Sequence, residues 1–366
     1  METLYEKLEK TINDESSYYY KKISNQIGLI DLIPNNNVAI NFIMEYFYTG
    51  GKSSLFLSDH EFSRAKHVIM SYFLGVMILN NTNLKQKLNA YIKKELNHIS
   101  NIFYEENDNT LYFWYLTALF HDIGYIFENK VTTKELSENE RSDIFLDSTS
   151  INGQVYSFKL NTNRFSVNTY HKYYLYAFKN LKIHEHGFLG GNMLFNRMKD
   201  NLVKKIKNEA SYDNAFNIKS FVSEDLHWSI NHLDIYRMLS FVVMEHNIWR
   251  LEDESLAREY GLDNLLLDNY KRIDSDNEPL LFLLSLVDAI EPFQKFDNEI
   301  GNKNPNFEVF LNFLNNTKIE FEANKVKISN FTQDILFKEV ENSVRDIKKW
   351  MNVEFKKVAY SFEISW

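Results

Sequence analysis

Residues 116–125 have the sequence LTALFHDIGY, and this stretch decides the fold that the sequence predicts. His121 and Asp122 stand side by side at the end of the apolar run Leu111–Phe120. That run is shorter than the roughly 20 apolar residues that cross a bilayer, so it predicts a buried helix of the core. Burying an ionisable pair is costly unless both groups are satisfied. A bound metal ion would satisfy the imidazole and the carboxylate together.

The composition favours a helical protein with a sizeable core. The 366 residues suit one large domain or two moderate ones, and 44% of them are apolar. Proline and glycine are scarce, at 4 and 11 residues, which favours long helices over a loop-rich β fold. The chain has no cysteine, which removes disulfides, thiolate nucleophiles and cysteine-type zinc sites. Because the acidic start Met1–Glu6 does not resemble a signal peptide, we expect a cytoplasmic protein.

The net charge of −9 argues against a broad nucleic-acid surface, because such a surface needs a cationic face. The local clusters Lys204–Lys207 and Lys348–Lys349 are small enough to be solvated helix faces. The sequence also lacks a complete glycine-rich phosphate loop and a Gly-x-Ser-x-Gly nucleophile elbow. An enzyme built on this chain would therefore use water as its nucleophile.

Helical patterns dominate the first 304 residues, for which we predict one helical domain. Ser58–Glu61 is a capping-box sequence, so a helix should run from it to about Leu79. On this helix His60, Arg64 and His67 would share one face. Further helices are predicted over Val38–Phe47, Leu84–Phe103, Tyr170–Lys182, Gly187–Asn208, Leu226–Trp249 and Leu280–Ile290.

Two segments depart from the helical pattern. Residues from about 128 to 169 form a polar insert in which Val155–Leu160 alternates like a strand, predicting a hairpin or an ordered loop that could act as a lid. After Asn304 we predict a small α+β appendage over 305–366, so the fold class is mainly α. A strand edge in the appendage could pair between subunits, which is compatible with a homodimer. The appendage comprises predicted strands over Thr317–Glu322 and Val326–Ile328, a helix over Gln333–Met351 and a terminal strand over Val353–Trp366.

Four other ionisable residues stand in apolar contexts like that of His121 and Asp122. His67 follows Arg64 on an apolar helix, and His186 opens the helix start HGFLGG. His246 lies late in an apolar segment, and Asp288 is a carboxylate inside the apolar sequence LLSLVDAI. Each histidine alone could be an ordinary core or surface residue, but the ordered set is harder to explain in that way.

The ordered set resembles the HD-domain superfamily of metal-dependent phosphohydrolases, over roughly His60–Pro292. The family pattern is a first His on a helix with a preceding Arg, then His-Asp, then one or two later His residues, then a distant Asp. The resemblance implies an HD-domain helical bundle. His186 and His246 match the later histidines of two-metal members, although His184 could be the ligand in place of His186. The residues that match the four core metal ligands are His67, His121, Asp122 and Asp288.

The resemblance also implies a cofactor and a reaction. Imidazoles and carboxylates suit Mn, Fe, Co, Ni or Zn, with Mg as a further option. One or two ions would be held, and Asp122 would bridge two. Two metals roughly 3.5–4 Å apart lower the pKa of a bound water and clamp a phosphate oxygen. We therefore expect a phosphohydrolase or phosphodiesterase acting on a small phosphorylated substrate, a nucleotide or nucleotide-derived signal, with Asp122 and Arg64 as its catalytic residues.

Arg64, Tyr125, Lys182 and His184 are the candidates for contacts to the substrate. Arg64 could bind a phosphate through its fork of donors, or could pair with a carboxylate. Packing or surface roles are the alternative for Tyr125 and Lys182. Tyr125 stands where cyclic-dinucleotide phosphodiesterases of the family carry a lysine, and the second histidine of the dNTP triphosphohydrolases is absent. No subfamily's substrate is therefore carried over to this chain.

Two other functions stay open. The same ligand arrangement occurs in HD-type mixed-valent di-iron oxygenases resembling myo-inositol oxygenase, and the ligands alone do not separate the two chemistries. The chain could also be a non-catalytic scaffold that binds a nucleotide or a partner protein, with the appendage as its interaction surface. Buried His and Asp residues retained without a metal would be destabilising, which argues against the scaffold. No membrane partner is expected.

Overall fold

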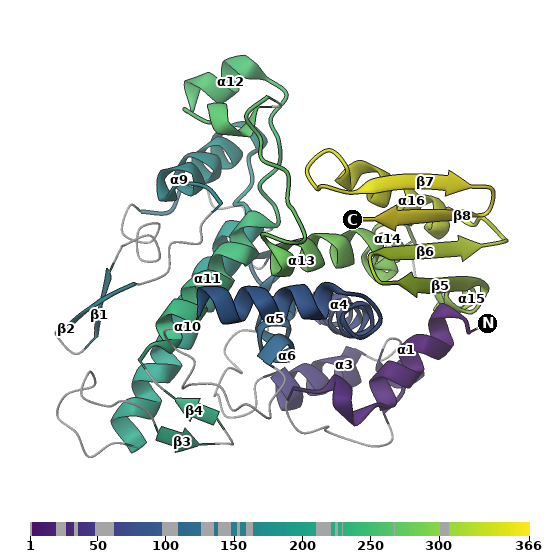
Figure 1. Cartoon of the computed structure of the whole chain (residues 1–366), viewed down its shortest axis with the longest axis horizontal. Helices are drawn as coiled ribbons and strands as arrows, with labels where there is room; N and C mark the ends of the chain where they lie inside the picture. Colours follow the sequence, from purple (N-terminus) through teal and green to yellow (C-terminus); the bar gives the residue numbers. More distant parts are fainter. Residues whose placement is uncertain are drawn as a thin grey trace. The chain divides into compact units, whose positions relative to one another are not determined.

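The structure is a computed structural model of the chain, and it describes residues 2–19, 27–32, 36–47, 62–96, 109–125, 135–137, 148–151, 154–158, 164–209, 221–223, 226–228, 230–266, 268–300 and 307–366. These residues are mostly helical, with a small sheet near the C-terminus, as the sequence predicts (Figure 1). They form two compact units, which are described one at a time. Unit 1 comprises Met1–Asn89, Thr110–Leu119 and Lys271–Trp366, and unit 2 comprises Ala90–Asn109 and Phe120–Tyr270.

Unit 1 is built around helix α4 (Phe62–Asn81), which is buried at every residue from His67 to Leu79. A helix that is apolar on all sides needs partners on all sides. These partners are α1 (Leu4–Asn13), α3 (Asn36–Phe42), α13 (Pro279–Ile290) and α14 (Pro292–Ile300). This unit also contains α2 (Leu29–Leu32), part of α5 (Leu84–Glu95), α15 (Phe307–Asn316), α16 (Ile335–Ile347), a 3-10 helix (Glu15–Ser17) and a π-helical turn (Ile43–Phe47).

Helix α6 (Asn109–Phe120) is the apolar helix predicted before His121, and its burial from Thr110 to Phe120 confirms it as a core helix. It packs on α4 at a glycine, because a Cβ on Gly75 would lie 2.1 Å from the Trp114 ring. The Trp114 indole N–H donates to the carbonyl of Tyr72 at 2.9 Å. These contacts hold α6 beside the helix that carries His67.

The sheet of unit 1 is antiparallel and has the strand order β5-β6-β8-β7 (Figure 1). Buried residues alternate along β6 and β8, and this face packs on α16, with the rings of Phe337 and Phe362 5.4 Å apart. The two strands predicted over residues 317–328 are confirmed, but the single terminal strand is wrong. The chain turns near Ala359, at φ 49°, and alanine is not one of the residues that mark turns in a sequence. The strands are β5 (Thr317–Glu322), β6 (Lys325–Asn330), β7 (Glu354–Val358) and β8 (Ser361–Ser365).

Unit 2 is organised by α10 (His186–Glu209) and α11 (His232–Glu245), which pack along each other (Figure 1). Their close approach depends on Gly191, because a Cβ there would lie 2.4 Å from the carbonyl oxygen of Ser240. Helix α9 (Val167–Tyr176) continues into a π-helical turn, Ala177–Leu181, that leads toward the start of α10. The remaining elements are β1 (Ser148–Ile151), β2 (Gln154–Ser157), β3 (Phe221–Ser223), β4 (Leu226–Trp228) and α12 (Glu254–Glu259).

The strand predicted in the polar insert is confirmed, since β2 pairs with β1 as a hairpin. The helix predicted over Leu226–Trp249 is wrong at its start, because β4 occupies the first residues and α11 begins at His232. A short apolar run does not distinguish a strand from a helix by periodicity. His60, the capping box and the predicted boundary at Asn304 lie outside the described residues. Within the described ranges, no helix combines the length and the apolarity that crossing a membrane requires.

Candidate metal centre

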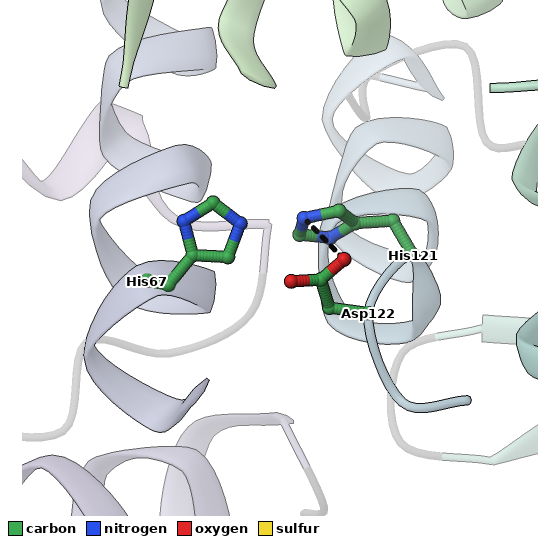
Figure 2. A group of neighbouring side chains, drawn as sticks. All are labelled: His67, His121 and Asp122. Atoms are coloured by element: carbon green, nitrogen blue, oxygen red, sulfur yellow. Dashed lines mark ion pairs between the residues drawn. The ribbon is translucent and has the colours of Figure 1, made fainter. Parts of the chain in front are cut away.

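The His121-Asp122 pair lies in the turn that ends α6. The backbone N–H of Ile123 donates to the carbonyl of Phe120, and that of Tyr125 donates to the carbonyl of Asp122, so the chain forms tight turns directly after the helix. Both side chains are buried, and His121 Nε2 lies 3.7 Å from Asp122 Oδ1 (Figure 2). The turn thus presents an imidazole and a carboxylate to the same point.

Gly124 allows the start of α10 to approach this turn. A Cβ on Gly124 would lie 1.9 Å from the carbonyl oxygen of His186 and 2.8 Å from the backbone nitrogen of Gly190. The approach brings His186 Nε2 to 3.8 Å from Asp122 Oδ1. The glycine after His-Asp-Ile is therefore required by the close passage of two backbones.

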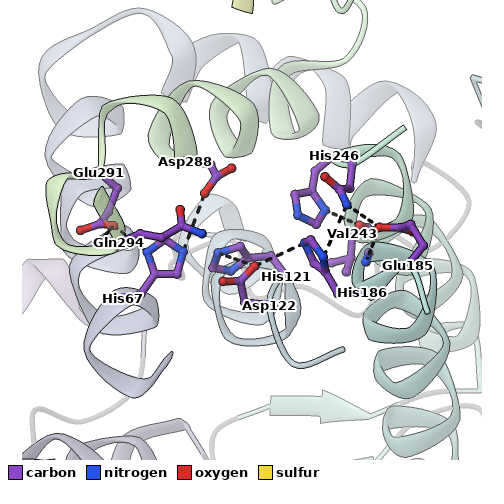
Figure 3. Close-up of polar contacts among 12 residues, drawn as sticks. His67, His121, Asp122, Glu185, His186, Val243, His246, Asp288, Glu291 and Gln294 are labelled. Atoms are coloured by element: carbon purple, nitrogen blue, oxygen red, sulfur yellow. Dashed lines mark hydrogen bonds and ion pairs between the residues drawn. The ribbon is translucent and has the colours of Figure 1, made fainter. Parts of the chain in front are cut away.

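His246 completes the group of ligand candidates in unit 2. It follows the last residue of α11, and its ring centroid lies 5.5 Å from that of His186 and 5.9 Å from that of His121 (Figure 3). Its Nδ1 lies 2.5 Å from the carbonyl oxygen of Val243. A carbonyl can only accept, so Nδ1 carries the proton and Nε2 is left as the coordinating nitrogen of the neutral ring.

One group of three side chains in unit 2 could hold a metal ion, because Asp122, His186 and His246 offer ligand atoms within 4.8 Å of one another. His121 lies directly beside this group, next to Asp122 (Figure 2). All four residues are buried. Such a concentration of buried imidazole and carboxylate would be costly unless a cation satisfied it, and the donor set suits Mn, Fe, Co, Ni or Zn.

In unit 1, His67 is oriented by a carboxylate that the sequence analysis did not single out. His67 Nδ1 lies 2.6 Å from Glu291 Oε2, so Nε2 is the ring nitrogen that could coordinate a metal, and Nε2 lies 3.8 Å from Asp288 Oδ1 (Figure 3). Glu291 is fully buried, and it also accepts the backbone N–H groups of Phe293 and Gln294 at the start of α14. A metal-binding histidine commonly donates its second N–H to such a carboxylate. Asp288 and Glu291 thus both lie beside His67 within unit 1.

A Glu291→Gln substitution should weaken the binding of a metal by about 10- to 100-fold, the usual cost of disturbing a group that orients a ligand. The amide offers one acceptor in place of two, while His67 and two backbone N–H groups all donate to Glu291. Titration of the metal-free variant with Mn²⁺ measures the change. Glu341→Gln is the matched control, because Glu341 is another buried glutamate of unit 1 and pairs with Lys357. Equal affinities in both variants would contradict an orienting role.

The four candidates for substrate contacts lie in different surroundings. Arg64 is half-buried on α4, one turn before His67. Tyr125 stacks on His186, with ring centroids 3.8 Å apart and planes inclined by 19°. His184 is buried, and its Nδ1 lies 2.7 Å from the Tyr174 hydroxyl, so the structure includes His186 rather than His184 in a ligand group. Lys182 is exposed.

Lys182 has a left-handed backbone conformation, with φ 60° and ψ 32°, where the π-helical turn ends. This conformation favours glycine, because a Cβ crowds the following carbonyl. A Lys182→Gly substitution should raise the free energy of unfolding by about 0.5–1 kcal/mol, which urea denaturation measures. The control Lys179→Gly lies within the π-helical turn and should lower it by about 1 kcal/mol. A loss of stability in Lys182→Gly would contradict the steric argument.

Comparisons of the chain with protein-family models, with curated proteins and with solved structures found no match. The class that the fold and the site define is a mainly helical protein whose buried His/Asp groups could hold a metal ion. Function must therefore be argued from the site.

Proposed function

We propose that the chain is a metal-dependent phosphohydrolase of the HD-domain superfamily, acting on a phosphate ester of a small substrate such as a nucleotide. The observation that carries the proposal is the buried group of Asp122, His186 and His246, whose ligand atoms lie within 4.8 Å of one another, with His121 beside Asp122. A carboxylate with two oxygens suits a bridging position between two ions. The family resemblance adds Asp288 as a ligand beside His67.

A divalent metal bound there would supply a Lewis acid for a phosphate oxygen and would lower the pKa of a water ligand. The side chains of the chain have the other roles. His121, His186 and His246 would bind as neutral imidazoles, and the Val243 carbonyl keeps His246 in the required tautomer. Arg64 would orient the phosphate through paired N–H donors. Tyr125 covers one face of the His186 ring and would keep water from that side.

The test begins with metal content. The protein, purified from medium supplemented with Mn, Fe, Co, Ni or Zn, is analysed for bound metal and then assayed against phosphomonoesters, cyclic nucleotides and nucleoside triphosphates. We expect metal-dependent release of phosphate or nucleoside from at least one class. Two irons per chain with oxygen consumption on a polyol or phosphonate would favour the oxygenase alternative. Failure to retain any metal would favour a non-catalytic scaffold.

A further inference from the structure

Glu185 is a buried carboxylate directly before His186, and no role in the proposed reaction has yet been given to it. Its side chain is 2% exposed. Its two oxygens accept backbone N–H groups in the first turn of α10, from Gly187 to Oε1 at 2.8 Å and from Phe188 to Oε2 at 2.7 Å. A negative charge at this position also matches the positive end of the helix dipole. The contacts fix the first turn of α10, which carries His186.

The same carboxylate reaches the second histidine of the group. Oε1 accepts the side-chain amide of Asn247 at 2.5 Å, and Asn247 follows His246 in the turn after α11. The side-chain oxygen Oδ1 of Asn247 in turn accepts the indole N–H of Trp249 at 2.8 Å, so the side-chain amide is held from both ends. One carboxylate therefore connects the helix start that carries His186 with the helix end that carries His246.

We propose that Glu185, acting through Asn247, is the positioning residue that holds His186 and His246 at the spacing of ligands to one metal ion. The proposal rests on the proposed metal-dependent function. Helix ends fray, and ligand geometry must be held to within roughly 0.5 Å for full affinity. Glu185 supplies that restraint at the point where the two helix ends meet, and its charge adds to the attraction for a cation.

Two variants separate the bridge from the helix cap. Glu185→Gln keeps the size of the side chain but presents an amide to three N–H donors, those of Gly187, Phe188 and Asn247. Asn247→Ala removes the bridge and leaves both contacts of Glu185 to the start of α10. Glu341→Gln is the matched control, a buried glutamate of the other unit with the same chemical change. Circular dichroism and thermal melting of the metal-free proteins verify that each variant folds.

The measurement is a Mn²⁺ titration followed by electron paramagnetic resonance, which counts bound ions and detects coupling between neighbouring ones. We expect both variants to lose about 10- to 100-fold in the affinity for one ion, with the coupled signal weakened and the other ion retained. Glu341→Gln should match the wild type. Since the cap survives in Asn247→Ala, a loss of affinity there cannot come from a frayed α10. Wild-type affinities and coupling in both variants would overturn the proposal.

The outcomes also separate this inference from the proposed function. In one outcome the wild-type protein binds two ions, the variants lose one of them, and no phosphate ester is hydrolysed. This outcome would support the positioning role and contradict the phosphohydrolase. A wild type that hydrolyses a phosphate ester, together with variants whose metal affinity is unchanged, would support the phosphohydrolase and contradict the positioning role. A wild type that binds no Mn²⁺ would overturn both.

Discussion

The Asp122→Asn variant should lose more than about 100-fold in metal-dependent hydrolysis, because Asp122 is the carboxylate of the buried ligand group that it forms with His186 and His246. The substitution preserves shape but removes the charge and replaces one oxygen by a donor that cannot coordinate. We expect the loss in the rate at saturating substrate, together with a lower metal content of the purified protein. Initial rates across metal concentrations, with metal analysis of the same samples, measure both effects.

Asp234→Asn is the matched control for this prediction. Asp234 is also a buried aspartate of unit 2, and it accepts the Tyr156 hydroxyl at 2.8 Å rather than belonging to a group of metal-ligand candidates. The control should lose some stability and keep its metal. If Asp122→Asn retained the wild-type metal content and rate, Asp122 could not be a metal ligand.

The Gly124→Ala variant should lower the free energy of unfolding by about 3 kcal/mol and should also weaken metal binding. The added Cβ would meet the His186 carbonyl oxygen and the Gly190 nitrogen, which are backbone atoms and can move only if α10 moves. Such a shift would carry His186 away from Asp122. The effect is purely steric, because Gly124 does not have a positive φ. Urea denaturation and a Mn²⁺ titration measure the two consequences.

Gly28→Ala is the matched control for the stability loss expected of Gly124→Ala. A Cβ on Gly28 would lie 2.4 Å from Glu9 Oε1, but that atom is the end of a flexible side chain that can rotate away. We expect a cost below about 1 kcal/mol and unchanged metal binding, since volume changes that neighbours can absorb are tolerated. Equal costs in the two variants would indicate that the start of α10 is free to shift.

Several features of the chain followed from local patterns in the sequence. The apolar run before His121 predicts a core helix, and α6 is buried throughout because none of its sides can face water. Alternation of apolar and polar residues predicted β2, β5 and β6, because opposite faces of a strand meet different environments. The residue types of the ligand candidates were likewise visible, since a buried imidazole or carboxylate stands out in an apolar segment.

Other features depended on residues far apart in the chain. Glu291 orients His67 from 224 residues away, and its only local signal was a carboxylate beside a proline at a helix start. Glu185 connects His186 to the turn after His246, and nothing near it in the sequence names that partner. The apolar run at Leu226–Trp228 predicts a helix, whereas the structure has a strand there, because a run of that length fits either structure.

The sequence by itself determined which segments are helical cores and which side chains could bind a metal, because periodicity and residue chemistry are local properties. Only the tertiary structure decided which of these side chains meet. The choice of His186 over His184 for a ligand group follows from the passage of Gly124 against the start of α10, a contact between backbones that no periodicity encodes. The orientation of each ring follows from its partner, a carboxylate for His67 and a carbonyl for His246.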